Sequence, residues 1–198
     1  MKVFFIRHAP TAMNLTGEMA LNYENATIIG DDKEEWFKKM GDLIPPLDFN
    51  VPICSSPAVR CRQTCHMLFN RNPDMVLEEL REFNCKDLGD MKFWEITQEE
   101  FENRVKIRSA DMERQVDILF KMFESFDSVF KNINNIICIS HGMVIRYIYH
   151  YLNNNKGITP YEIINSKGFT FANLDLLVYD TIENTILVRN YKDPIKHG

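Results

Sequence analysis

The sequence lacks the features that mark several common classes of protein. No stretch approaches the ~20 apolar residues that a membrane-spanning helix requires. With a net charge of −5, the chain also lacks the basic excess typical of proteins that bind nucleic acid or anionic membranes. The five cysteines are an odd number, and no secretory signal precedes them, which favours a reducing compartment over a disulfide framework. We therefore expect a cytoplasmic protein with no nucleic-acid or membrane partner.

Motifs for nucleotide and metal chemistry are missing as well. No glycine-rich loop ends in Gly-Lys-Ser/Thr, and no glycine fingerprint follows the first apolar run, so neither a P-loop nor a Rossmann site is predicted. Cys61, Cys65 and His66 lie close together, but no second Cys/His pair with metal-ligand spacing stands elsewhere. Buried reduced thiols are the better interpretation. The sequence thus indicates neither a metal nor a cofactor.

Apolar runs alternate with helical patterns along the chain. Residues 3–6, 51–54 and 136–139 predict strands buried on both faces, and residues 174–179 and 185–189 predict two more strands. Helices are expected at 31–43, from Pro57 to about 70, at 98–126 as one helix or two, and at 143–152. This alternation predicts one α/β domain spanning residues 1–198, with helices on both faces of a mainly parallel sheet.

Three of the predicted strands end in residues suited to binding an anion. The first ends in Arg7 and His8, the second leads to Arg60, and the third leads to His141. An arginine in a first helical turn is more often solvated, and a lone histidine is more often structural. In an open α/β sheet, however, ligands bind beyond the carboxyl ends of the strands, and helix N-termini there add N–H donors. The coincidence of three such ends predicts one anion site.

Two histidines and two arginines make a coherent phosphoryl-transfer site. A neutral imidazole can attack phosphorus. A guanidinium can donate hydrogen bonds to two phosphoryl oxygens at once, and it stays charged. The group still needed is an acid that protonates the leaving oxygen, for which a carboxyl with a raised pKa is the natural candidate.

Three segments resemble one known family. Residues 7–14, Arg-His-Ala-Pro-Thr-Ala-Met-Asn, resemble the Arg-His-Gly-x-Thr-x-x-Asn signature of the histidine phosphatase superfamily, and the Ala-Pro form is similar to that of alpha-ribazole phosphatases. Residues 55–64 resemble its Ser-Ser-Pro-x-x-Arg-x-x-Gln-Thr segment, and residues 140–146 its Ser/Thr-His-Gly-Gly-Val-Ile-Arg segment. The resemblance implies a three-layer α/β/α fold like that of phosphoglycerate mutases.

The resemblance also implies roles for the matching residues. His8 would be the phosphorylated nucleophile, and the Leu-Arg-Glu match at residues 80–82 makes Glu82 the proton donor, with Glu78 and Glu79 as nearby alternatives. The groups that would hold the phosphoryl group are Arg7, Asn14, Arg60, His141 and the Gly142 amide.

Some positions depart from the family pattern. Lys86 stands where a glycine usually follows the acid, and Gly89-Asp90 replaces the usual Glu-Gly pair. The chain is also shorter than typical phosphoglycerate mutases, which favours a phosphatase. We expect a metal-independent phosphatase that hydrolyses a small phosphorylated metabolite through phosphohistidine. A mutase, a protein phosphatase and a catalytically silent binding module remain alternatives, and the oligomeric state, with a homodimer among the options, stays open.

Overall fold

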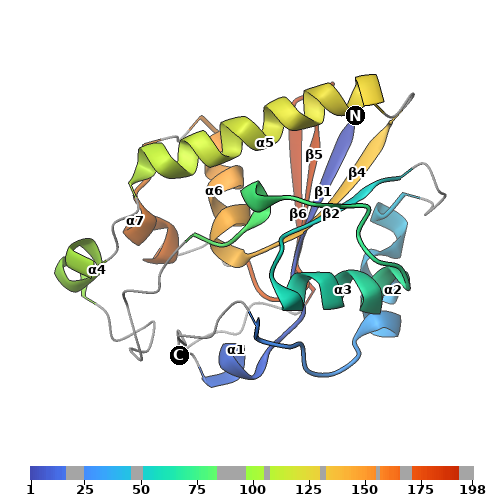
Figure 1. Ribbon diagram of the computed structural model, residues 1–198, viewed down its shortest axis with the longest axis horizontal. Coiled ribbons are helices and arrows are strands. Elements are labelled where there is room, and N and C mark those ends of the chain that lie inside the picture. The colour runs from blue at the N-terminus through green and yellow to red at the C-terminus, as the bar shows by residue number, and fades with distance from the viewer. Residues whose placement is uncertain are drawn as a thin grey trace.

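A computed structural model describes residues 1–16, 25–45, 51–83, 97–104, 108–129, 133–154, 157–165 and 171–191. The departures at Lys86, Gly89 and Asp90 lie outside these ranges. A six-stranded sheet with the strand order β3-β2-β4-β1-β5-β6 forms the centre of the molecule (Figure 1). The strands are β1 (Lys2–Arg7), β2 (Ile53–Ser55), β3 (Met75–Val76), β4 (Asn135–Ser140), β5 (Leu176–Asp180) and β6 (Thr185–Arg189).

The sheet is mainly parallel, as the sequence predicted. The strands β3, β2, β4 and β1 run parallel to one another, whereas β5 pairs antiparallel with β1 and β6 pairs antiparallel with β5. All five predicted strands are present. The two-residue strand β3 was not predicted, because the apolar run at 75–77 has only three residues and stands between Asp74 and Glu78.

Helices cover both faces of the sheet, which confirms the three-layer α/β/α arrangement (Figure 1). Along β1, Val3 and Phe5 pack into a core with α5 (Ser109–Val129) and α6 (Gly142–Leu152). The alternate residues Phe4 and Ile6 pack into a second core with α2 (Lys33–Met40) and α3 (Val59–Phe69). Both faces of the strand are therefore apolar, which explains its continuous hydrophobic run.

The helical predictions were confirmed in part. The pattern at 98–126 forms two helices, α4 (Gln98–Arg104) and α5, and the helix at 31–43 is α2 followed by the 3₁₀ turn η2 (Gly41–Leu43). The expectation that Pro57 is the first helical residue was wrong, because Ala58 is still extended (φ −59°, ψ 138°) and α3 begins at Val59. Short elements that the sequence did not reveal are α1 (Ala12–Thr16), η3 (Glu78–Leu80) and α7 (Pro160–Asn165).

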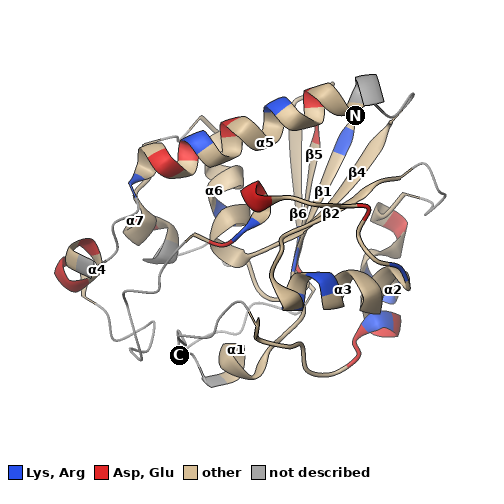
Figure 2. Cartoon of the chain, viewed as in Figure 1, with Lys and Arg blue, Asp and Glu red and all other residues tan. Residues whose placement is uncertain are grey.

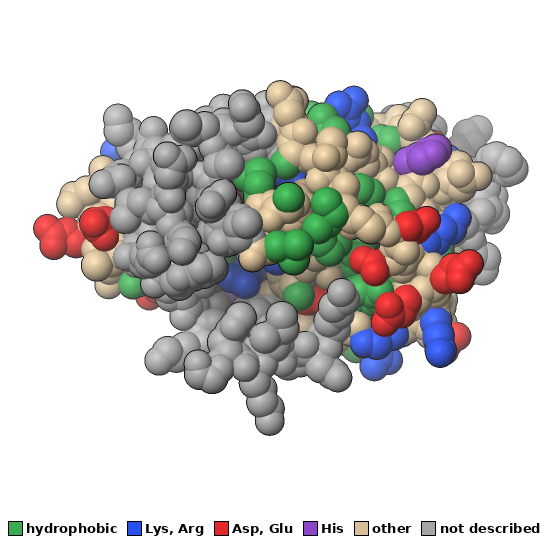
Figure 3. All heavy atoms as spheres, turned by 90° about the horizontal axis from the view of Figure 1, so that it is seen from below, with side chains coloured by type: hydrophobic (Ala, Val, Ile, Leu, Met, Phe, Trp, Pro, Cys, Tyr) green, Lys and Arg blue, Asp and Glu red, His purple; other side chains and the backbone are tan. Residues whose placement is uncertain are grey.

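Charged residues are frequent on helices such as α4 and α5, and few lie on the strands (Figure 2). None of the helices in the described residues combines the length and apolar character that crossing a bilayer would require. The parallel strands β1, β2 and β4 end side by side, since Arg7 pairs with Ser140 and Ser55 pairs with Ile139. Viewed from below, the molecule shows basic side chains recessed beside hydrophobic ones (Figure 3).

Candidate active site

His8 follows β1 directly and is held in a defined tautomer. Its Nδ1 lies 2.8 Å from the carbonyl oxygen of Ala9, and because a carbonyl only accepts, Nδ1 carries the hydrogen. The lone pair therefore resides on Nε2. Burial, with His8 only 1% exposed, lowers the pKa of the imidazole, and the positive charges of Arg60 and Arg7 lower it further. His8 is thus a neutral imidazole with an available lone pair, as a nucleophile requires.

The backbone around His8 is fixed by contacts from distant segments. The His8 N–H donates to the carbonyl of Ser140 at 2.9 Å, which joins it to the end of β4. The Ala9 N–H donates to Thr64 Oγ1 at 2.8 Å, and that hydroxyl donates in turn to the carbonyl of Arg60 at 2.7 Å. Thr64 therefore connects the end of β1, next to His8, to the first turn of α3, which carries Arg60.

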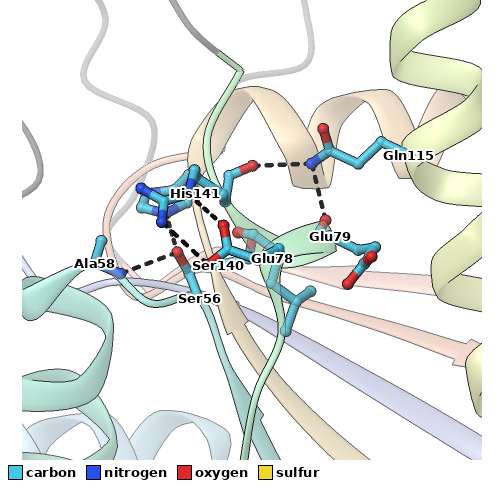
Figure 4. A network of polar contacts seen from close by, with 9 residues as sticks. Ser56, Ala58, Glu78, Glu79, Gln115, Ser140 and His141 are labelled. Carbon is cyan, nitrogen blue, oxygen red and sulfur yellow. Dashed lines mark hydrogen bonds and ion pairs between the residues drawn. The ribbon is translucent and has the colours of Figure 1, made fainter.

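His141 precedes α6 and lies beside His8, with the two ring centroids 5.3 Å apart. Arg60 Nη2 lies 2.8 Å from His141 Nδ1, and since a guanidinium only donates, Nδ1 is the acceptor. Nε2 then carries the hydrogen and donates to Ser56 Oγ at 2.8 Å (Figure 4). Burial, followed by the charge of Arg60, lowers the pKa of His141. Both histidines are therefore neutral, and the positive charge of the site comes from the arginines.

Arg7 and Gly142 pack directly against each other. A Cβ atom on Gly142 would lie 3.2 Å from both Cζ and Nε of Arg7, so a glycine here allows the guanidinium to approach the first turn of α6. The guanidinium also donates through Nη1 to the carbonyl of Phe171. Arg60, which is 1% exposed, projects from the first turn of α3 toward the same place. The predicted Arg7, Arg60, His8 and His141 thus come together at one end of the sheet.

Asn14 lies in α1 and is linked to His8 by a residue that the sequence analysis missed. The Oδ1 atom of Asn14 accepts from the N–H and the hydroxyl of Thr11, both at 3.0 Å, which directs its Nδ2 donor end away from Thr11. Asn173 Nδ2 donates to Asn14 Oδ1 at 3.2 Å and to the carbonyl of His8 at 2.9 Å. Asn173 therefore links the predicted donor Asn14 to the backbone of His8.

The turn that carries Asn173 is held by Asp175. The buried Asp175 carboxylate accepts from the N–H groups of Ala172 and Tyr191, at 2.6 and 2.7 Å, and from Asn190 Nδ2 at 3.0 Å. Between Asn173 and Asp175, Leu174 adopts a left-handed conformation with φ of 65°, which costs about 1 kcal/mol or more for a residue with a Cβ. These contacts offset that cost and hold the Phe171 carbonyl and Asn173 against Arg7 and His8.

Glu82 lies at the N-terminus of α6. Its Oε2 accepts from the N–H of Met143 at 3.4 Å, and its Oε1 accepts from the N–H of Phe83 at 3.2 Å. Burial of the carboxyl raises its pKa, and the charges of Arg60 and Arg7 oppose this only in part. A carboxyl with a raised pKa retains its proton to higher pH, which is the property expected of a general acid.

The two alternative acids are placed differently. Glu78 is exposed and forms an ion pair with Arg81, with 2.8 Å between Glu78 Oε2 and Arg81 Nε, and hydrogen bonding to Arg81 lowers the pKa of the Glu78 carboxyl. The side chain of Glu79 points away from His141 (Figure 4). Of the three glutamates, Glu82 has the environment that suits proton donation.

The cysteines near the site are unsuited to nucleophilic chemistry. Cys54 stands six residues before Arg60, a spacing also found in thiol phosphatases, but its side chain is buried in the sheet core with Cys138. Cys61 Sγ lies 3.5 Å from His141 Nε2, and burial raises the pKa of the Cys61 thiol to about 12. The Cys61 thiol therefore stays protonated at neutral pH, whereas a thiolate would be the reactive form.

Fold and site together define an α/β protein with a candidate anion site. Two neutral histidines, two arginines and a partly buried carboxyl form this site at the carboxyl end of a mainly parallel sheet. The family model described as histidine phosphatase superfamily (branch 1) matches residues 3–190, so the chain belongs to the histidine phosphatase superfamily. The expectation from the sequence motifs is confirmed at the level of the family.

Solved structures of phosphatases have a similar fold. The phosphoserine phosphatase from Entamoeba histolytica, solved in complex with 3-phosphoglyceric acid, is 16% identical with a TM-score of 0.70, covering 98% of each chain. A putative alpha-ribazole-5'-P phosphatase from Escherichia coli is 18% identical with a TM-score of 0.66, covering 96% of each chain. The alpha-ribazole phosphatase from Shigella flexneri has a TM-score of 0.61 at 16% identity, covering 96% of this chain and 95% of that one. No match is found among curated proteins.

Proposed function

We propose that the protein is a phosphatase that hydrolyses the phosphomonoester of a small metabolite through a phosphohistidine intermediate on His8. The observation that carries this proposal is the tautomer of His8, whose Nδ1 hydrogen is donated to Ala9 so that Nε2 holds the lone pair. Because the side chain of His8 is buried, a phosphoryl group at the end of a small molecule suits the site better than one on a protein surface.

The first step transfers the phosphoryl group to the enzyme. The Nε2 lone pair of His8 forms a bond to phosphorus while the ester P–O bond breaks, and its electron pair goes to the leaving oxygen. Glu82 gives its proton to that oxygen, so the product leaves as an alcohol. Arg7 and Arg60 balance the charge on the phosphoryl oxygens, and the carbonyl of Ala9 stabilises the positive imidazole ring through Nδ1–H.

The second step returns His8 to its starting state. Glu82, now a carboxylate, takes a proton from a water molecule as the water oxygen forms a bond to phosphorus. The P–N bond breaks and its electron pair returns to Nε2, which releases inorganic phosphate. Two guanidinium groups supply the positive charge that a metal ion would otherwise bring, so no metal is required.

Measuring phosphate release from a panel of phosphorylated metabolites tests this function. We expect turnover of at least one small phosphomonoester, with activity retained in the presence of a chelator. Incubation with 3-phosphoglycerate and a trace of 2,3-bisphosphoglycerate separates hydrolysis from mutase activity. Isomerisation without phosphate release, or binding of phosphate without turnover of any ester, would overturn the proposal.

The pH profile is expected to reflect Glu82. General-acid catalysis requires Glu82 in its protonated form. Because the pKa of Glu82 is raised, this form persists to a higher pH than in an ordinary glutamic acid. The lowered pKa of His8 keeps the nucleophile neutral at that pH. We therefore expect a bell-shaped profile whose basic limb disappears in Glu82→Gln. The measurement is kcat/KM against pH for an alkyl phosphate, with Glu79→Gln as the control that keeps both limbs.

A further inference from the structure

Gln115 on α5 contacts the backbone of the segment that leads into Glu82. Gln115 Nε2 donates to the carbonyl of Glu79 at 2.9 Å and to the carbonyl of Arg81 at 2.9 Å (Figure 4). An amide nitrogen carries two hydrogens, so these two contacts use both of its donors. Gln115 comes from the 21-residue helix α5, whose apolar side packs against the sheet.

A serine from the sheet holds the residue between these two contacts. Ser140 Oγ donates to the carbonyl of Leu80 at 2.8 Å, and both Ser140 and the Leu80 side chain are fully buried. Three consecutive carbonyls, those of residues 79–81, therefore accept hydrogen bonds from side chains of α5 and β4. The next residue along the chain is Glu82.

We propose that Gln115 is a positioning residue that sets the place of the Glu82 carboxyl for protonation of the leaving oxygen. The inference rests on the proposed function. Gln115 acts through the backbone, since its amide contacts the carbonyl directly before the acid. Two backbone N–H groups also donate to the carboxyl, from Met143 at 3.4 Å and from Phe83 at 3.2 Å, so Gln115 shares the placement of Glu82 with these donors. A small displacement of an acid weakens proton transfer without removing the nucleophile.

Gln115→Met tests this role, because methionine keeps the unbranched shape but has no N–H donor. Two substrates distinguish positioning from general stability. An alkyl phosphate needs its leaving oxygen protonated, whereas 2,4-dinitrophenyl phosphate has a leaving group that departs without a proton. We expect kcat on the alkyl phosphate to fall about tenfold, a fraction of the whole general-acid contribution, and kcat on the dinitrophenyl ester to stay within about threefold.

Two further variants serve as controls. Gln98→Met makes the same change on α4, where the Gln98 amide donates to exposed Glu102 at 2.8 Å, and it should leave both rates unchanged. Gln115→Lys retains N–H donors and should preserve much of the alkyl phosphate rate, even if Gln115→Met folds poorly. An unmodified enzyme that hydrolyses neither ester would contradict the proposed function itself. Three results would overturn the positioning role. They are an equal loss of kcat on both esters in Gln115→Met, no loss of kcat in Gln115→Met, and a selective loss of the same size in Gln115→Lys.

Discussion

His8→Ala is expected to lower kcat by about 10⁴-fold or more, because removal of a covalent nucleophile leaves only the binding and charge balance of the remaining site. Neighbouring groups cannot replace it. His141 has its Nδ1 lone pair occupied by Arg60, and the Cys61 thiol is protonated at neutral pH. The measurement is phosphate release from the best substrate of the metabolite panel.

His66→Ala is the matched control for this substitution. His66 is exposed on α3 and has no place in the proposed mechanism, so its removal should leave kcat within about twofold of the parent. A His8→Ala enzyme that retained full activity would show that the nucleophile lies elsewhere.

Arg60→Met is expected to reduce kcat/KM by about 10²–10³-fold, the loss typical of a charge-stabilising donor in a buried active site. Two effects act together. In the proposed mechanism the phosphoryl oxygens lose a guanidinium partner, and His141 Nδ1 loses its hydrogen-bond donor. Because Arg60 also lowers the pKa values of His8 and His141, its removal should raise both of them. The acid limb of the pH profile should therefore move to higher pH.

Arg62→Met provides the comparison on the same helix. Arg62 is exposed, so the substitution removes the same charge from α3 without changing the site, and activity should be preserved. We therefore expect kcat/KM to fall in Arg60→Met and to stay close to the parent value in Arg62→Met. An Arg60→Met enzyme with an unchanged acid limb would contradict the electrostatic role assigned to Arg60.

The sheet could be predicted from the sequence because local patterns encode it. The same patterns indicated the residues at its carboxyl end, Arg7 with His8 and Arg60 with His141. Phe4 and Phe5 face different cores, so residues 3–6 of β1 form a continuous apolar run, and its end at Arg7 is visible in the sequence. Parallel strands place their carboxyl ends together, which makes the meeting of Arg7 with Arg60 and His141 a consequence of topology.

Other parts of the site depend on contacts between segments far apart in the chain. Asn173 and Gln115 lie in stretches whose local patterns describe a turn and a helix, and nothing in those patterns specifies the backbone carbonyls they reach. Likewise, the Ser56 hydroxyl accepts from the nearby N–H of Ala58 and also from His141, which lies 85 residues further along the chain. Such positioning contacts arise only when the sheet has assembled.

Trapping of the phosphorylated enzyme tests the proposed mechanism most directly. The enzyme would be mixed with phosphate-labelled substrate, quenched in base within the first turnover and analysed by mass spectrometry of its peptides. We expect a phosphoryl group on Nε2 of His8, stable in base and lost in acid, and none in His8→Ala. Phosphate release with no label on His8 at any time, or label on another side chain, would contradict the phosphohistidine mechanism.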